Sequence, residues 1–311
     1  MVSIKRILCP IDFSEFSRHA LMRAVAVAKA HRASVMALHV VPIPLPVFVS
    51  HLEVSEPPQL GLAHAARERL LRELTDFTAP QHSMCVPIDT DVVDAETVHG
   101  EILAQAERLR ADLIVMGTHG RTGFQRLLLG SVTDKVLRTA RQPVLTVGAP
   151  AGEQDTTAAF KRILCAIDFS ECSIAALTYA VSLADGADTH LGAVNVIEWT
   201  PIGYDPLGGP PVDLAGYRMA AETTARERLH RVVRDSAPTL AVEEIVTSGK
   251  PHHEILRIAA EHRSDLIVLG IHGRNPIDRM LFGSTAEPVV RRATCPVLTV
   301  RADVAAKVAA A

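Results

Sequence analysis

Hydrophobic residues along the first half of the chain fall into two alternating patterns. Short continuous apolar runs, such as IKRILCPID and DLIVMG, are typical of strands that a fold buries on both faces. The longer segments between them place apolar residues three or four positions apart, as an amphipathic helix does. The predicted elements are strands at 4–12, 33–41, within 84–93, 111–117 and 143–148, and helices at 14–31, 61–77, within 96–109 and 131–140.

Strands that alternate with helices indicate an α/β fold in which helices cover both faces of a parallel sheet. Right-handed crossovers then give an open, doubly wound sheet. Ser14 is expected to cap the first helix with its hydroxyl. The Pro-rich segment 42–59 suits neither a helix nor a central strand, so we expect an irregular excursion there.

The second half of the chain repeats the first. KRILCPIDFSE at 5–15 matches KRILCAIDFSE at 161–171, ADLIVMGTHGR at 111–121 matches SDLIVLGIHGR at 264–274, and PVLTV occurs near the end of both copies. We therefore predict two tandem domains, each with one five-stranded, doubly wound parallel sheet. The predicted boundaries are a first domain at 1–148, a linker at 149–159, a second domain at 160–301 and a tail at 302–311.

Composition and charge narrow the class of protein. The 311 residues are 48% hydrophobic and 22% charged, with a formal net charge of −3, which argues against a broad nucleic-acid or membrane-binding surface. Five cysteines without CxxC spacing favour neither a disulfide framework nor a zinc site, and they fit a reducing cytoplasm. No signal peptide and no apolar run of ~20 residues is present, so we expect a cytoplasmic protein that does not cross a membrane.

A glycine-rich stretch follows the fourth predicted strand of each copy. GTHGRTGFQRLLLGS at 117–131 and GIHGRNPIDRMLFGS at 270–284 share the spacing Gly-x2-Gly-x9-Gly-Ser. Glycines permit positive φ and close approach of a ligand, and the helix that follows offers free amides to an anion. The alternative is that Gly117 and Gly130 only permit turns and that Ser131 only caps a helix. Because the spacing recurs beside a strand-end Asp in both copies, a phosphate cradle is favoured.

Taken together, ILCPIDFSE, DLIVMGTHGRTG, LLLGSVT and PVLTV resemble the universal stress protein family in its tandem two-domain form. The glycine spacing with the strand-one Asp resembles the ATP-binding branch of that family. The resemblance implies a Rossmann-like, adenine nucleotide α-hydrolase-like fold and ATP as the ligand, with Mg²⁺ as an optional companion. It also implies a role in the stress response.

The resemblance assigns site residues position by position. In the first copy, Pro10, Ile11 and Asp12 would line the ribose and adenine, and Val40 would contact the adenine; Met116, Gly117, Thr118 and Gly120 would frame the ribose and phosphates; Gly130, Ser131, Val132 and Thr133 would bind phosphate oxygens. The matching positions in the second copy are Asp168, Val196, Leu269, Gly270, Ile271, Gly273, Gly283, Ser284, Thr285 and Ala286.

The two copies differ within these positions. Thr118 is replaced by Ile271 and Thr133 by Ala286, so the second copy lacks two hydroxyls, and Pro288 removes one amide from the start of a helix. A lost hydrogen bond to a charged group is worth ~1.5–3 kcal/mol. We therefore predict that the first copy binds ATP more tightly than the second.

Other polar residues have two interpretations each. His119 and His272 could act as a base or could stabilise their loop with a hydrogen bond, and the second role is favoured. Arg121 and Arg274 could balance phosphate charge or lie in solvent. A metal site at the neighbouring pair His252 and His253 is not favoured, and ribose binding is favoured over metal binding for the strand-end aspartates.

Binding is favoured over catalysis. No Walker pattern GxxxxGK[ST] occurs, and neither glycine stretch contains a lysine. We expect an ATP-binding regulatory protein that acts through nucleotide-dependent conformation and interaction, with little or no turnover. The alternatives are a slow ATPase or nucleotidyl-transfer enzyme and a nucleotide-free interaction protein. The resemblance further implies pairing through PVLTV, either as an intramolecular pseudo-dimer or as a homodimer, together with a protein partner that the sequence does not identify.

Overall fold

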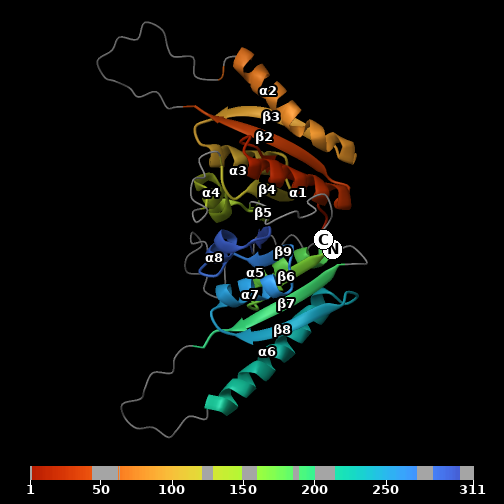
Figure 1. Ribbon diagram of the computed structural model, residues 1–311, viewed down its shortest axis with the longest axis vertical. Coiled ribbons are helices and arrows are strands. Elements are labelled where there is room, and N and C mark those ends of the chain that lie inside the picture. The colour runs from red at the N-terminus through yellow and green to blue at the C-terminus, as the bar shows by residue number, and fades with distance from the viewer. Residues whose placement is uncertain are drawn as a thin grey trace, which may run out of the picture. The chain divides into compact units, whose positions relative to one another are not determined.

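The chain divides into two compact units, one from Ser3 to Ala158 and one from Ala159 onward. Figure 1 shows the computed structural model, which describes residues 2–43, 62, 64–120, 129–148, 160–184, 189–199, 214–271 and 283–301. The predicted linker and tail, and most of the Pro-rich excursion, lie outside the described residues.

Strands and helices alternate in the first unit in the predicted order. Its strands are β1 (Arg6–Pro10), β2 (Ser34–Pro42), β3 (Ile88–Ala95), β4 (Leu113–Gly117) and β5 (Val144–Val147). Its helices are α1 (Glu15–His31), α2 (His64–Thr78), the 3-10 helix η1 (Ala79–Met84), α3 (Val98–Arg108) and α4 (Ser131–Thr139). Only η1 was not predicted.

The second unit repeats this order. Its strands are β6 (Arg162–Ala166), β7 (His190–Ile197), β8 (Val242–Ser248), β9 (Leu266–Gly270) and β10 (Val297–Val300). Its helices are α5 (Glu171–Leu183), α6 (Leu214–Ser236), α7 (Pro251–Glu261) and α8 (Ala286–Arg292).

Each unit contains an all-parallel sheet with the same strand order. The order is β3-β2-β1-β4-β5 in the first unit and β8-β7-β6-β9-β10 in the second. In the first unit α1 and α2 pack on one face and α3 and α4 on the other (Figure 1). The predicted doubly wound fold is confirmed, and the strand order reverses between β1 and β4, where such sheets bind ligands.

The continuous apolar runs correspond to strands that are buried on both faces. Leu8 and Cys9 in β1 are fully buried, as are Ile114 and Val115 in β4. Cys9 and its counterpart Cys165 are free cysteines, and burial strongly raises the pKa of both thiols. Buried neutral thiols of this kind behave as small apolar side chains.

Serine caps fix the start of the first helix in each unit. Ser14 accepts a hydrogen bond from the amide of Ser17 at 3.2 Å, as predicted, and Ser170 accepts one from Ser173 at 3.3 Å. Such a cap contributes about 1 kcal/mol to helix stability. Each cap places the start of its helix directly after the strand-end Asp.

The fourth helix begins at different places in the two units. In the first unit α4 begins at Ser131, whereas Ser284 and Thr285 form a turn and α8 begins at Ala286. Pro288 accounts for the difference, because a proline has no amide for an intrahelical hydrogen bond. A proline is tolerated only in the first turn of a helix, where the amides have no intrahelical partner.

Candidate functional site

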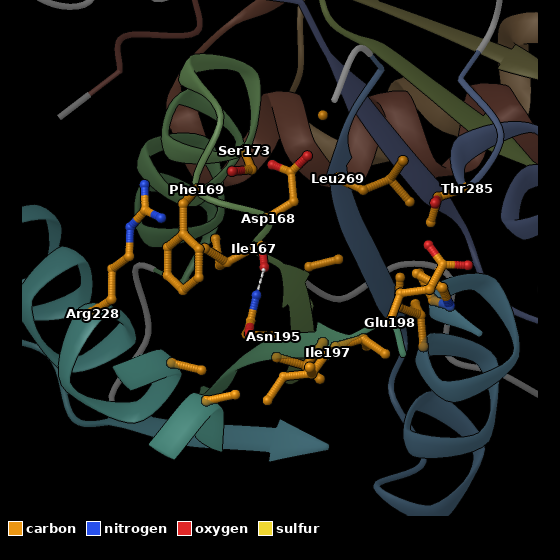
Figure 2. A pocket seen from close by; sticks show the side chains of 18 of the residues that line it. Ile167, Asp168, Phe169, Ser173, Asn195, Ile197, Glu198, Arg228, Leu269 and Thr285 are labelled. Atoms are coloured by element: carbon orange, nitrogen blue, oxygen red, sulfur yellow. Dashed lines mark hydrogen bonds between the residues drawn. The ribbon is translucent and has the colours of Figure 1, made fainter. Parts of the chain in front are cut away.

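A cleft with a volume of about 880 Å³ lies at the carboxyl ends of β6, β7 and β9 (Figure 2). This volume falls within the range of ~300–1,000 Å³ that is usual for small-molecule sites. The cleft is lined by seven residues that the sequence predicted for the second copy: Asp168, Val196, Leu269, Gly270, Gly283, Ser284 and Thr285. Gly273 lies outside the described residues. The fold therefore brings together three segments that are far apart in the sequence.

One wall of the cleft was not predicted from the sequence. It is a face of α6, on which the lining residues follow helical spacing: Tyr217, Ala220, Ala221, Thr224, Ala225 and Arg228. The guanidinium carbon of Arg228 lies 4.3 Å from the ring centre of Phe169. Figure 2 shows this pair on one side of the cleft and Glu198 and Thr285 on the other. The spacing on α6 is visible in the sequence, but it does not tell which elements that face covers.

The strand-end aspartates are held in the same way in both units. Oδ1 of Asp12 accepts hydrogen bonds from the amide and the hydroxyl of Ser14, at 3.1 and 2.5 Å. Asp168 accepts the same two bonds from Ser170, at 2.9 and 2.5 Å. Because Oδ1 is fixed by these bonds, the direction of the whole carboxylate is set before any ligand binds.

A phenylalanine in the left-handed region separates each Asp from its Ser. The φ angle is 62° at Phe13 and 66° at Phe169. This conformation costs a bulky residue on the order of 1–3 kcal/mol. The hydrogen bonds between the Asp and the capping Ser offset part of that cost. Backbone strain of this kind at the same place in both copies is typical of a functional turn.

Gly117 and Gly270 allow a helix to pack closely against the end of a strand. A Cβ on Gly117 would lie 2.8 Å from Cβ of Phe16 in α1, and a Cβ on Gly270 would lie 2.7 Å from Cβ of Cys172 in α5. Backbone atoms of the same helices lie within 3.0 Å of these positions. The structure thus gives both glycines a packing role that does not depend on a ligand.

Gly120, Gly130 and Gly283 also stand where other atoms of the protein approach the backbone closely. A Cβ on Gly120 would lie 2.7 Å from Oδ2 of Asp12, and a Cβ on Gly283 would collide with the carbonyl oxygen of Ile271. Gly130 donates a hydrogen bond to the carbonyl of Thr118 at 2.8 Å. Among the described glycines only Gly249 has a positive φ. Positive φ, one of the two properties considered from the sequence, is therefore not used at Gly117, Gly120, Gly130, Gly270 or Gly283.

The two hydroxyls that distinguish the copies have partners within the protein. Thr133 donates from Oγ1 to the carbonyl of Gly117 at 2.8 Å, and Oγ1 of Thr118 lies 2.9 Å from Nδ1 of His119. Both threonines are buried, as are their apolar replacements Ile271 and Ala286. The replacements therefore remove internal hydrogen bonds, which weakens the basis for predicting tighter binding in the first copy.

The structure gives His119 the favoured role of stabilising its loop. Besides the Thr118 contact, its ring packs against Phe16 with the ring centres 5.0 Å apart. Its Nε2 is buried and has no hydrogen-bond partner within the structure as described. A buried polar atom without a partner is costly, so a ligand atom at the end of β4 would relieve this cost. His272, Arg121 and Arg274 lie outside the described residues.

The remaining predicted residues of the first copy lie at strand ends and at the start of α4. Pro10 ends β1, Val40 lies in β2 and Met116 lies in β4. The others are Ile11, which follows β1, and Ser131 and Val132, which open α4. Gly130 occupies the N-cap position of α4 without a side-chain hydrogen bond, so Ser131 does not cap this helix.

A histidine lies in the first turn of the third helix in both units. Burial and the charge of Lys135 lower the pKa of His99 in α3. The pKa of His252 in α7 is lowered by burial and by three neighbouring groups, while Glu198 acts in the opposite direction; the three are His253, Arg292 and Lys250. The two histidines occupy the second position of their helices, a match that the sequence analysis does not predict. Within the described ranges no three His, Cys, Asp or Glu residues form a metal-binding group.

The residues that line the cleft of the second unit have the chemistry to hold an adenine nucleotide. Val196 and Leu269 offer an apolar surface to a base, and Asp168 offers a carboxylate whose direction is fixed. Ser284 and Thr285 add hydroxyls and amides at the end that lies next to α8. Gly283 lets the backbone at this end pass close to the carbonyl oxygen of Ile271, with which a Cβ would collide. One cleft thus combines an apolar surface, an oriented carboxylate and hydroxyl and amide donors.

Comparisons with known proteins agree with one another. The Universal stress protein family model matches residues 3–148 and 159–301. A universal stress protein of Methanocaldococcus jannaschii is 35% identical over 153 residues, covering 48% of this chain and 85% of its own length. A universal stress protein of Mycolicibacterium smegmatis is 28% identical over 307 residues, covering 95% and 96% of the two chains.

Solved structures support the fold over nearly the whole chain. The crystal structure of a universal stress protein from Archaeoglobus fulgidus matches with a TM-score of 0.62 at 23% identity, over 95% of this chain and 96% of its own. The crystal structure of a putative universal stress protein from Pseudomonas aeruginosa matches with a TM-score of 0.67 at 18% identity, over 98% of this chain and 96% of its own.

In the described part of the chain, no helix has the length and hydrophobicity needed to span a bilayer.

Proposed function

This chain belongs to the universal stress protein family, with two of its domains in tandem, and from that premise we propose that it is an ATP-binding regulator of the stress response. The nucleotide binds in the cleft of the second unit, and binding changes the conformation that the protein presents to a partner. Turnover of ATP is slow or absent.

One observation carries this proposal. Seven positions that were assigned to nucleotide binding from the sequence line a single cleft of about 880 Å³, although they come from three separate segments. If the glycines served packing alone, the domain would have no need of an open cleft beside them. The cleft also lies where the strand order reverses, which is the usual ligand site of this class of sheet.

Each part of the nucleotide has a matching group in the cleft. The base would lie against Val196 and Leu269, and the ribose hydroxyls would donate to Asp168. The phosphates would lie at Gly283, Ser284 and Thr285, with Mg²⁺ as their counterion. ATP would supply a triphosphate of high negative charge. The residues of this chain would orient the nucleotide and exclude water from its base.

The charges of the cleft argue for binding without rapid hydrolysis. Among the residues that the structure describes, the charged ones that line it are Asp168, Glu198 and Arg228, and Arg228 stacks on Phe169. Phosphoryl transfer needs positive charge at the terminal phosphate and an oriented nucleophile. No lysine lies in either glycine stretch of the sequence. A regulator that holds its nucleotide is therefore the better match.

Ligand release from the purified chain tests this function. The protein is denatured, and the supernatant is separated by ion-exchange chromatography against adenine and guanine nucleotide standards. We expect ATP or ADP to be released, in an amount that falls when the protein is dialysed extensively before it is denatured. Chain that has been emptied and then titrated with ATP should bind it again.

A turnover assay with and without Mg²⁺ then separates a binder from an enzyme. We expect fewer than one ATP hydrolysed per chain per minute, on the order of several hundred-fold below the typical enzyme rate of ~10 s⁻¹. An emptied chain that binds no adenine nucleotide at millimolar concentration would contradict the proposed function. Rapid hydrolysis would contradict the regulatory assignment alone.

A further inference from the structure

A polar residue occupies the same position near the end of the second strand in both units. It is His39 in β2 and Asn195 in β7. His39 contacts the carbonyl oxygen of Ile11 through Nδ1 at 2.7 Å, and Asn195 donates from Nδ2 to the carbonyl of Ile167 at 2.7 Å. Two different side chains therefore make the same hydrogen bond in the two copies.

The hydrogen bond fixes which way each side chain faces. A carbonyl oxygen only accepts, so the atom of Asn195 that faces Ile167 must be the amide nitrogen. The amide oxygen then points the opposite way, as Figure 2 shows. By the same reasoning Nδ1 of His39 carries the proton, and Nε2 of the neutral ring is left as an acceptor.

Bracing the turn after the first strand does not account for this arrangement by itself. The amide of Ile167 already donates to the carbonyl of Val194 at 2.8 Å, and that of Ile11 donates to Leu38 at 2.8 Å. The turn is thus tied to the neighbouring strand by backbone atoms in both units. Asn195 also lines the cleft, and it presents only a small part of its surface there.

We infer that Asn195 selects the base of the nucleotide, and that His39 has the same role in the first copy. This inference rests on the proposed function. An acceptor at this position pairs with the amino group at C6 of adenine and repels the keto oxygen that guanine and hypoxanthine carry there. Asn195 also retains a second N–H, which can donate to a ring nitrogen of adenine.

The bond to Ile167 is what makes the selection effective. A free asparagine could rotate its amide by half a turn and present N–H to a keto base. Here the rotation would turn the amide oxygen toward the carbonyl oxygen of Ile167, so two acceptors would face each other and a buried hydrogen bond would be lost. The Ile167 carbonyl thus holds Asn195 in the orientation that suits adenine.

Competition between ATP and ITP tests this inference, because the two differ at C6 of the base. The full chain is emptied of nucleotide and titrated with each by calorimetry. The first variant chain carries N195L with H39L, which removes both acceptors at similar side-chain volume. The second carries the exchange N195H with H39N, in which each copy receives the side chain of the other. Thermal melting checks that both variant chains are folded.

The ratio of the two affinities is the readout, since a purely structural role would weaken both ligands together. We expect the natural chain to prefer ATP by roughly tenfold or more, as a hydrogen bond gained against a repulsion predicts. The leucine pair should bring the ratio to within about twofold of equality, and the exchanged chain should keep the preference.

Three results would each overturn the inference while leaving ATP binding intact. The leucine variant could retain the preference for ATP, the exchanged variant could lose it, or the natural chain could show no preference. A natural chain that binds neither nucleotide would remove the proposed function, and this inference with it. The two failures are therefore distinguishable.

Discussion

At the scale of single residues, the glycines at the ends of β4 and β9 separate packing from ligand binding. Gly117 and Gly270 face the backbone of α1 and α5 so closely that a Cβ would overlap atoms of those helices. Neither glycine requires a positive φ. Their first role in the molecule is therefore to let helix and strand approach each other.

Gly117→Ala and Gly270→Ala are each expected to destabilise their own unit by about 1–3 kcal/mol, as overpacking does. Gly148→Ala is the matched control, because a Cβ there would meet Oγ1 of Thr118 at an ordinary 3.9 Å. Denaturant unfolding of the three variants measures the free energies. Unchanged stability together with lost nucleotide binding would show that these glycines serve the ligand instead.

Two half-buried histidines, His99 and His252, make stability depend on pH. Burial comes first among the causes that lower the pKa of both His99 and His252 below the ordinary value of 6.5. The folded chain therefore takes up a proton less readily than the unfolded chain. Stability is fully present above pH ~6.5 and decreases as the pH falls below it, because protons then favour the unfolded state.

We expect the melting temperature to fall between pH 7.5 and 5.5, and the fall to be smaller in the variant His99→Gln with His252→Gln. His190→Gln at the exposed start of β7 is the control. Thermal melts followed by circular dichroism at both pH values give the comparison. An equal fall in all three proteins would contradict the assignment to His99 and His252.

At the scale of elements, the hydroxyl of Thr133 joins α4 to the end of β4. It donates to the carbonyl of Gly117 at 2.8 Å from a buried position. Thr133→Val should cost about 1–2 kcal/mol of stability, because it leaves that carbonyl without the bond. Nucleotide affinity should change less than threefold, well below the roughly 5–30-fold loss that removing a ligand contact worth 1–2 kcal/mol would cause. A large loss of affinity at unchanged stability would return the hydroxyl to the phosphate role expected from the sequence.

The order of the elements could be predicted because parallel strands buried on both faces leave continuous apolar runs. The cap at Ser14 could also be predicted, since its position before an apolar helical pattern is local information. The partners of Thr118 and Thr133 could not, because these hydroxyls bond to groups whose position depends on how α4 returns to the sheet. The face of α6 that lines the cleft depends on the same tertiary geometry.

Two further features have a signal in the sequence itself. His39 and Asn195 are polar residues at matching positions of otherwise apolar strands, which points to a specific hydrogen bond. From the sequence, Pro288 predicts only that the helix lacks one amide. In the structure its effect is larger, and α8 begins only at Ala286. In both cases the difference between the two copies at one matching position is the signal.

At the scale of the whole molecule, the duplication has produced two sites that differ in detail. Both keep the Asp and Ser turn and the polar residue before the end of the second strand. The replaced threonines do not establish that the first copy binds more tightly, since both hydroxyls have internal partners. Which copy binds ATP more tightly stays a prediction that separate variants can decide.

Pairing through the last strands also stays a prediction. β5 and β10 each lie at an edge of the sheet of their own unit, and an edge strand can pair with another strand. If the two copies satisfy each other as a pseudo-dimer, light scattering should give the mass of one chain, 33.5 kDa. Twice that mass would support a homodimer instead.

Nucleotide binding in the second unit is tested most directly by calorimetric titration with ATP. The natural chain and the variants Asp168→Ala and Asp12→Ala are each emptied of nucleotide and titrated. We expect Asp168→Ala to weaken binding in the cleft of the second unit by about 10–100-fold, because it removes a charged hydrogen-bond acceptor. Asp12→Ala should leave that cleft unchanged. If Asp168→Ala binds ATP as the natural chain does, the second cleft is not the nucleotide site.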